Sequence, residues 1–359
     1  MARLRRADCS GPGIRRRRRG KGFEYLSDDG KRISAQSERD RIARLAIPPA
    51  WEDVWISPHP NGHIQATGTD AAGRKQYRYH DDWRKRRDRE KFEEMEDFAR
   101  ALPRLRRRVE RDLQLEGMPR AKTLAVATRL LDRGFFRIGS EDYAEENDTY
   151  GVATMKRRHV TIEGDVITFD YEAKGGQRRV QAIGDPEVAR IVETLKRRRG
   201  GGDDLLAYKE GRRWKDIKSG DINDYVKDAA GGDYSAKDFR TWSGTVLAAV
   251  ALAVSGMAPG TKSGRKRAKT RAVKEVAEYL GNTPAVCRAS YIDPRLFDRF
   301  DGGLTISGAM PELAEEGADW PDVQRKVEEA VLDLIDRDLT SEAVERRREL
   351  ADDVTKVAA

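Results

Sequence analysis

Residues 275–291 read EVAEYLGNTPAVCRASY, a pattern that predicts two helices joined by a tight turn. Gly281 is suited to end the first helix because glycine adopts the left-handed backbone conformation without steric cost. Thr283 is suited to cap the second helix, and Pro284 fits its first turn, where no backbone N–H is required. Asn282 is therefore expected to be held in the joint between the two helices.

Tyr291 closes this stretch and is its candidate functional group. At about 3.6 residues per turn it falls roughly two turns into the second helix, and the Asp293-Pro294 pair prevents that helix from continuing much further. The phenol is expected near a helix end, where it could face a groove. A single tyrosine in a helical hairpin is ordinarily a core or surface residue, so other residues have to decide its role.

Arg137 and Lys174 are the first basic residues that bear on it. Arg137 follows an apolar helical pattern that Gly134 can end, so we expect rigid structure rather than a loose loop to hold it. Lys174 lies between two strand-like runs. Because the pair Gly175-Gly176 is typical of a hairpin turn, the sequence predicts Lys174 at the tip of a β-hairpin.

Lys237 and Arg240 lie at the start of a further predicted helix. Ser235 and Asp238 have the spacing of a capping box, which places Lys237 and Arg240 on one face of the first helical turn. Taken singly, each of these basic residues is ordinarily a solvated surface charge. Their order along the chain and their local context make them informative together.

The order of these motifs resembles that of the type IB DNA topoisomerases, in the compact poxvirus-like form found in bacteria. The resemblance extends from about Ile47 to Tyr291. It implies four main catalytic residues: Tyr291 as the nucleophile, Lys174 as the general acid, and Arg137 and Arg240 as the arginines that bind the phosphate. Lys237 resembles a second lysine that assists proton delivery.

Asn282 departs from the poxvirus pattern, which has a histidine at the matching position. An amide can still donate a hydrogen bond to a non-bridging phosphate oxygen, but it carries no proton that it could give away at pH 7. We therefore expect Asn282 to complete the phosphate site without acid-base work. The chain has four histidines, none near Tyr291 in sequence, and we expect all of them to be structural or solvent-facing: His59, His63, His80 and His159.

The resemblance implies relaxation of supercoiled DNA through transient cleavage of one strand, a 3′-phosphotyrosyl intermediate and religation. Fixed guanidinium groups suit this chemistry because negative charge accumulates on the non-bridging oxygens in the transition state. The sequence has no glycine-rich phosphate loop and no carboxylate cluster suited to Mg²⁺. We expect no cofactor, no metal and no ATP requirement.

Two segments are candidates for binding double-stranded DNA. Residues 73–79 resemble the family's N-terminal DNA-contacting strand, with expected contacts from Arg74, Lys75, Gln76, Tyr77 and Tyr79. Residues 261–271 contain no acidic residue and link the Arg240 helix to the Tyr291 region, which suggests a loop that follows the phosphate backbone. Its expected contacts are Lys262, Arg265, Lys266 and Arg267.

The pattern along the chain predicts an α+β protein. Residues 1–22 hold nine Lys/Arg against one Asp, including the Arg15–Arg19 run, and are expected to form a basic disordered arm. We expect a small antiparallel β-rich domain at residues 23–82, with strands near 23–26, 31–33, 63–67 and 76–79. A mainly helical catalytic domain with the inserted hairpin follows at residues 83–300, with Pro103 interrupting its first charged stretch. An acidic helical extension at residues 301–359, amphipathic from Val323 to Leu339, would either dock on the body or repel a second duplex.

Two lobes of this kind could close around a duplex as a clamp, with the basic run Arg84–Arg89 as the hinge region. Such a clamp can act as a monomer. With no apolar run of membrane-spanning length and no signal peptide pattern, the chain is expected in the bacterial cytoplasm, associated with the nucleoid. Cys9 and Cys287 are too few for a disulfide framework or a zinc site.

Two other classes of protein share some of these features. A tyrosine recombinase uses the same phosphotyrosyl chemistry, but that family usually has histidine where this chain has Lys237, three residues before Arg240. The β-rich N-terminal region also favours the topoisomerase, because recombinases usually carry a helical one. In a non-enzymatic basic DNA-binding protein, Tyr291 would be incidental.

Overall fold

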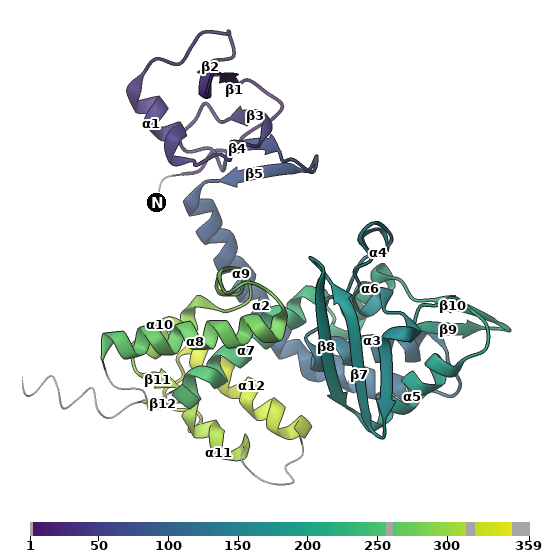
Figure 1. The fold of residues 1–359 in the computed structure, drawn as a ribbon. Coiled ribbons are helices and arrows are strands. Elements are labelled where there is room, and N and C mark those ends of the chain that lie inside the picture. Colours follow the sequence, from purple (N-terminus) through teal and green to yellow (C-terminus); the bar gives the residue numbers. More distant parts are fainter. Residues whose placement is uncertain (1–2, 256–260, 314–319, 347–359) are drawn as a thin grey trace, which may run out of the picture. The chain divides into compact units, whose positions relative to one another are not determined.

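The computed structural model describes residues 3–255, 261–313 and 320–346 of the 359-residue chain (Figure 1). The chain divides into two compact units, residues 1–93 and 94–359. An antiparallel sheet dominates the first unit and helices dominate the second, so the predicted α+β class is confirmed.

The first unit is a five-stranded antiparallel sheet in the order β2-β1-β3-β4-β5, with one helix packed against it. Its elements are β1 (Ile14–Arg19), β2 (Gly22–Leu26), α1 (Gln36–Arg44), β3 (Glu52–Ile56), β4 (Ile64–Thr69) and β5 (Lys75–Tyr79). Ile42 of α1 meets Val54, Ile56 and Ala66 of the sheet in the core. Three of the predicted strands are present, whereas residues 31–33 make only an isolated bridge through Arg32, and β3 was not predicted.

The prediction of a disordered arm over residues 1–22 is wrong for the Arg15–Arg19 run, which belongs to β1. This strand pairs with β2 on one side and with β3 on the other. Ile14 is buried, and the guanidinium of Arg16 stacks over the ring of Phe23 at 4.2 Å, while the other arginines of the run are exposed. Because side chains alternate between the two faces of a strand, a run of arginines can pair in a sheet with most of its charge in water.

Helix α2 (Asp81–Leu113) starts at the predicted domain boundary and continues past residue 93, where the two units divide. The Arg84–Arg89 run lies within its first turns, and its role as a hinge stays a prediction, as does the two-lobed clamp. Pro103, which interrupts the charged stretch in the sequence, lies inside the helix and does not end it. Buried side chains on both sides of it, among them Leu102 and Leu105, hold the helix against the core.

The second unit combines helices with a three-stranded antiparallel sheet in the order β6-β7-β8 (Figure 1). The predicted hairpin is therefore confirmed as part of a larger sheet, and a second hairpin, β9-β10, was not predicted. The strands are β6 (Val160–Glu163), β7 (Val166–Ala173), β8 (Gln177–Gly184), β9 (Ala207–Glu210), β10 (Arg213–Asp216), β11 (Leu304–Thr305) and β12 (Glu345–Arg346). The helices are α3 (Arg120–Gly134), α4 (Glu141–Asn147), α5 (Pro186–Arg197), α6 (Ser219–Ala230), α7 (Ala236–Val254), α8 (Lys262–Leu280), α9 (Pro284–Ser290), α10 (Pro294–Asp301), α11 (Met310–Leu313) and α12 (Trp320–Asp336).

The prediction that residues 261–271 form a loop is wrong. This basic segment is the start of α8. The hydroxyl oxygen of Thr261 accepts a hydrogen bond from the Gly264 N–H at 3.1 Å and so caps the helix. Ala268 and Ala272, four residues apart, are buried and give the basic segment an apolar stripe. This spacing of apolar residues indicates a helix, but the many charged residues around it made the segment look like a loop.

Helix α12 of the acidic extension packs on α7 and α10, so docking on the body is the alternative that the structure supports. Its buried residues, including Val327 and Leu334, recur at helical spacing. Arg106 of α2 joins the helix through Glu328 at 2.7 Å and also binds Asp132 at 2.8 Å. The extension is thus tied to the body by apolar packing and by a largely buried arginine.

Among the described residues, no helix is both long enough and apolar enough to cross a membrane. Cys9 and Cys287 are free thiols.

Candidate active site

Four of the six predicted catalytic residues come together at the C-terminal end of α8. Arg137 lies just beyond α3, which ends where Phe135 adopts a left-handed conformation with φ of 55°. Its guanidinium donates to the Gly281 carbonyl oxygen at 2.9 Å and to the side-chain oxygen of Asn282. The first predicted arginine is therefore bound directly to the joint between α8 and α9.

Arg240 reaches the same helix end from the first turn of α7. It is 4% exposed and donates to the Leu280 carbonyl oxygen at 2.8 Å and to the Phe135 carbonyl oxygen. Its guanidinium carbon lies 5.2 Å from the centroid of the Tyr291 ring. Burial lowers the pKa of Arg240, and Arg137 lowers it further, but an arginine stays charged at physiological pH. The site thus contains a desolvated, fixed positive charge beside a phenol.

Asn282 keeps a hydrogen-bond donor available. Its side-chain oxygen accepts from Arg137, which fixes the orientation of the amide. The buried amide nitrogen makes no hydrogen bond of good geometry among the described residues and has only the weak acceptor Cys287 beside it, and Nε of Arg240 likewise makes no such bond. Because buried donors are ordinarily satisfied, these two N–H groups are suited to bind an oxygen of a ligand.

Three tyrosines lie near these arginines, and their surroundings differ. Tyr150 is buried, and its hydroxyl donates to Asp148 at 3.1 Å. Tyr171 of β7 is 5% exposed, its hydroxyl donates to Gln181 at 3.1 Å, and burial raises its pKa. Tyr291 is half-buried and follows the last residue of α9. The accessible phenol is therefore the one that the sequence singled out.

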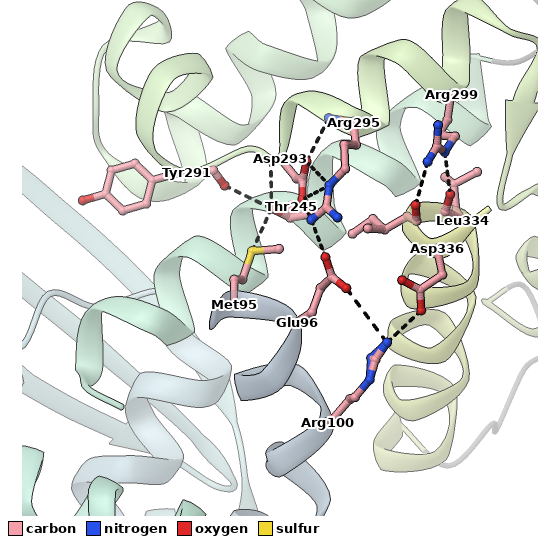
Figure 2. Close-up of polar contacts among 11 residues, drawn as sticks. Met95, Glu96, Arg100, Thr245, Tyr291, Asp293, Arg295, Arg299, Leu334 and Asp336 are labelled. Atoms are coloured by element: carbon pink, nitrogen blue, oxygen red, sulfur yellow. Dashed lines mark hydrogen bonds and ion pairs between the residues drawn. The ribbon is translucent and has the colours of Figure 1, made fainter. Parts of the chain in front are cut away.

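The backbone of Tyr291 is seated on α7, one turn beyond Arg240. The Thr245 hydroxyl donates to the Tyr291 carbonyl oxygen at 3.4 Å and accepts from the Asp293 N–H at 3.2 Å. A Cβ on Gly244 would lie 2.6 Å from the Tyr291 carbonyl oxygen, so glycine is required for this close approach. Figure 2 shows the Tyr291 ring projecting away from Thr245 and Asp293. This contact was not predicted from the sequence, although a glycine in the middle of a helix is a signal for a close approach.

Asp293, two residues after Tyr291, is fully buried and anchors the same segment (Figure 2). Its carboxylate pairs with Arg295 at 2.6 Å, and Arg295 also pairs with Glu96 of α2. Arg100, one turn along α2, lies 3.9 Å from Glu96 and 2.7 Å from Asp336 of α12. The segment that carries Tyr291 is thus tied to α2, which is itself tied to the acidic extension.

Lys174 and Lys237 lie on the predicted elements. Lys174 is exposed in the turn between β7 and β8, where Gly175 and Gly176 have φ of 85° and 70°. Lys237 is exposed in the first turn of α7, whose start is fixed by the Asp238 carboxylate accepting from the Ser235 N–H at 2.8 Å. The roles of both lysines in proton transfer stay predictions.

Arg179 of β8 was not predicted, and it reaches the same end of α8. It donates to the Glu278 carbonyl oxygen at 2.8 Å and to the Tyr279 carbonyl oxygen at 2.6 Å. A small cavity beside the site is lined by residues that include Arg137, Arg179 and Arg240. A sequence signal existed, since in the predicted hairpin Arg179 falls opposite Tyr171, on the half-buried side of β8.

The predicted DNA-contacting residues of the first unit lie on β5 and the turn before it. Tyr77 and Tyr79 are 43% and 41% exposed, and their rings stack with centroids 5.9 Å apart. Lys75 is exposed beside them, whereas Gln76 lies on the other face of the strand and donates to Asp70 at 2.9 Å. Arg74 pairs with the same aspartate at 3.0 Å.

The basic residues predicted in the second unit lie in the first turns of α8. Lys262, Lys266 and Arg267 are exposed, and Arg265 lies 4.0 Å from Asp301. Lys262, in the first turn, opposes the helix dipole and so does not stabilise the start of α8. These basic residues remain candidates for phosphate contacts.

Three of the histidines have structural roles, as predicted. The Nδ1 atoms of His63, His80 and His159 accept hydrogen bonds from the backbone N–H groups of Ala7, Asp82 and Lys156. Burial, with Arg158 and Lys156 nearby, lowers the pKa of His159 to about 4. That histidine is neutral at physiological pH.

Comparison with known proteins gives two matches to family models. Residues 80–298 match the model of the eukaryotic DNA topoisomerase I catalytic core, and residues 22–70 match the model of the bacterial DNA topoisomerase IB N-terminal domain. The DNA topoisomerase 1B of Acanthamoeba polyphaga mimivirus is 32% identical over 288 residues, which cover 78% of this chain and 85% of the viral protein. The DNA topoisomerase 1 of Daucus carota is 26% identical over 202 residues, 54% of this chain and 24% of the plant protein.

Proposed function

The chain belongs to the type IB DNA topoisomerase family, and from this premise we propose that it relaxes supercoiled DNA through a 3′-phosphotyrosyl intermediate without metal or ATP. The observation that carries the proposal is the convergence of Arg137, Arg240, Asn282 and Tyr291 at the end of α8. The family match leaves no support for a recombinase or a non-enzymatic DNA-binding protein.

The nucleophile in this proposal is the Tyr291 hydroxyl, which attacks a backbone phosphorus and displaces the 5′-oxygen of the next nucleotide. Negative charge then accumulates on the two non-bridging oxygens. Arg137 and Arg240 stabilise that charge, and their positions are set beforehand by the backbone carbonyl groups to which they donate. A guanidinium has five N–H donors, so donation to two carbonyl groups leaves others for the phosphate.

The leaving 5′-oxygen needs a proton, and the proposed acid is Lys174, assisted by Lys237. A lysine can serve as an acid at neutral pH when desolvation and nearby positive charges favour its loss of a proton. Bound DNA would cover the exposed hairpin turn and bring the lysine close to the arginines. Because the phosphotyrosyl bond keeps the energy of the broken phosphodiester, the 5′-hydroxyl can religate the strand without ATP.

DNA contacts outside the site are proposed for two surfaces. On β5, Tyr77 and Tyr79 offer exposed ring faces next to Lys75, which suits contact with bases and backbone. In α8, Lys262, Lys266 and Arg267 offer exposed charge to phosphates. We propose that a single chain closes around the duplex. We also propose that it works in the bacterial nucleoid, and the match to a bacterial N-terminal domain supports the bacterial setting.

We expect the purified chain to relax positively and negatively supercoiled plasmid in EDTA and without nucleotide, because arginines supply the charge that a metal would otherwise supply. Relaxation is measured by agarose gel electrophoresis, and the Tyr291→Phe variant serves as the inactive control. Binding should weaken steeply with salt as counterions are released from DNA. A strict requirement for Mg²⁺ would overturn the proposed mechanism.

We expect Asn282→Ala to slow DNA cleavage by about 10²-fold, the usual loss when one donor to a developing oxyanion is removed. Asn282→His should retain most of the activity, because either side chain can donate to a non-bridging oxygen. Single-turnover cleavage of a short duplex measures both variants. Full activity of the alanine variant would remove Asn282 from the phosphate site.

A further inference from the structure

We infer that Arg179 is a positioning residue that holds the Lys174 hairpin against the end of α8. The inference rests on the function proposed above, in which Lys174 is the general acid. Arg179 lies on β8, five residues after Lys174, and faces Tyr171 across the hairpin. Its guanidinium leaves the hairpin and donates to the carbonyl oxygens of Glu278 and Tyr279 at 2.8 and 2.6 Å.

The end of α8 is suited to bind this group. The last carbonyl groups of a helix lack partners within it, and the helix dipole makes that end negative. Arginines from three elements occupy consecutive carbonyls: Arg179 of β8 binds Glu278 and Tyr279, Arg240 of α7 binds Leu280, and Arg137 after α3 binds Gly281. Arg137 and Arg240 are the proposed phosphate ligands. Because Arg179 binds the same helix end, it fixes the position of the hairpin relative to those two arginines.

Gly281 allows Arg179 to come this close. The glycine has φ of 58°, and a Cβ at this position would lie 3.0 Å from a terminal nitrogen of Arg179. The guanidinium is therefore seated directly on the residue that precedes Asn282. The joint between α8 and α9 thus contacts the hairpin as well as Arg137.

Arg179 is also well placed along the hairpin. Gln181 attaches the deeper part of β8 by donating to the Gly134 carbonyl oxygen at 2.5 Å, and Arg179 lies two residues nearer to the turn. Lys174 itself is exposed at that turn. Because a guanidinium fork that binds two oxygens fixes both distance and angle, it can hold the strands close to the turn in one orientation.

The expected consequence of losing Arg179 is a misplaced acid. A displacement of about 1 Å at a reacting group can cost on the order of 10²-fold in rate. Arg179→Ala should therefore slow cleavage by about 10 to 10²-fold. Arg179→Lys should also be slow, because lysine keeps the charge and the stem but cannot bind two carbonyl groups as a fork.

The test uses a duplex in which the 5′-bridging oxygen at the cleavage site is replaced by sulfur, since a thiolate leaves without a proton. If Arg179 acts through Lys174, both Arg179 variants should return to within a few-fold of wild type on this substrate. The Arg179→Ala change should also add little to the defect of Lys174→Ala on the oxygen substrate, because coupled residues are not additive. Thermal stability and DNA affinity of the Arg179→Lys variant should stay close to wild type.

Arg178→Ala is the matched control. Arg178 is the neighbouring residue, is exposed, and pairs with Asp170 of the same hairpin at 2.6 Å, so its loss should leave both cleavage rates nearly unchanged. Two results would overturn the inference and leave the proposed function standing. One is an equal defect of the Arg179 variants on the oxygen and sulfur substrates, and the other is a wild-type cleavage rate of these variants on the oxygen substrate. If Lys174→Ala is not rescued by sulfur, the acid assignment fails and the inference fails with it.

Discussion

Tyr291→Phe is expected to abolish covalent adduct formation and DNA relaxation while leaving DNA binding nearly intact. The change removes only the hydroxyl group. The ring keeps its place 5.2 Å from the Arg240 guanidinium, and the backbone keeps its contact with Thr245. Phosphate contacts dominate the affinity of proteins for DNA, and this substitution replaces none of the basic residues. Detergent-resistant protein–DNA adducts measure cleavage, and binding at one fixed salt concentration measures affinity.

Tyr171→Phe is the control for that experiment, because Tyr171 is a second phenol near the arginines. Its hydroxyl is buried and bound to Gln181, so the variant should still form the adduct. Peptide mapping of the wild-type adduct should find the nucleotide on Tyr291. An adduct formed by the Tyr291→Phe variant would place the nucleophile elsewhere, and Tyr171 would be the first residue to test.

Lys174→Ala is expected to slow cleavage of ordinary DNA by about 10²- to 10⁴-fold, the range for a lost general acid. On the sulfur-substituted duplex the same variant should recover most of its rate, because the leaving thiolate is far less basic than an alkoxide. Arg137→Ala and Arg240→Ala should recover less. The charge that those arginines stabilise lies on the non-bridging oxygens, which are the same in both substrates.

Single-turnover cleavage on the two substrates separates an acid from a phosphate-binding charge. Lys237→Ala is the informative companion, since Lys237 is exposed on the first turn of α7, the helix that carries Arg240. It should show a smaller defect on oxygen and none on sulfur. Equal defects of Lys174→Ala on both substrates would make Lys174 an electrostatic contact, and Lys237 would become the candidate acid.

Helix α12 of the acidic extension is joined to the Tyr291 segment by a series of ion pairs. Asp336 of α12 binds Arg100, which lies one helical turn from Glu96, and Glu96 pairs with Arg295 beside the Tyr291 segment (Figure 2). Arg299 of α10 adds hydrogen bonds to the Leu334 and Ile335 carbonyl oxygens. Through these contacts helix α12 is linked to the segment that carries Tyr291.

Local sequence signals predicted the elements that carry the site. Thr283 and Pro284 start α9 where the capping rules place it, and Gly281 ends α8 with φ of 58°. Gly175 and Gly176 form the predicted turn at Lys174. These features depend on residues adjacent in the chain, whose backbone preferences and caps act over a few positions. The family resemblance, and not local pattern, supplied the roles of the residues.

The two predictions that relied on charge were wrong, because the burial of those segments depends on residues distant in the sequence. The Arg15–Arg19 run looked disordered, yet it pairs with β3, whose Trp55 lies 40 residues after Arg15. The basic segment at residues 261–271 looked like a loop, yet Ala268 and Ala272 give it a buried face. The composition of a segment gives its charge but does not show which distant part of the chain packs against its uncharged face.

The sequence by itself determined the helix-to-helix joint and the hairpin, because both depend on short-range turn and cap chemistry. It also contained the order of the catalytic motifs, which became informative through the family resemblance. The tertiary structure alone decided that Arg137, Arg179 and Arg240 converge on the carbonyl groups at the end of α8, and that Gly244 and Thr245 seat the backbone of Tyr291. Those contacts join residues 40 to 144 positions apart. The physical reason is that a helix end offers unpaired carbonyl groups to any donor that the fold brings near, and no local pattern records which donor arrives.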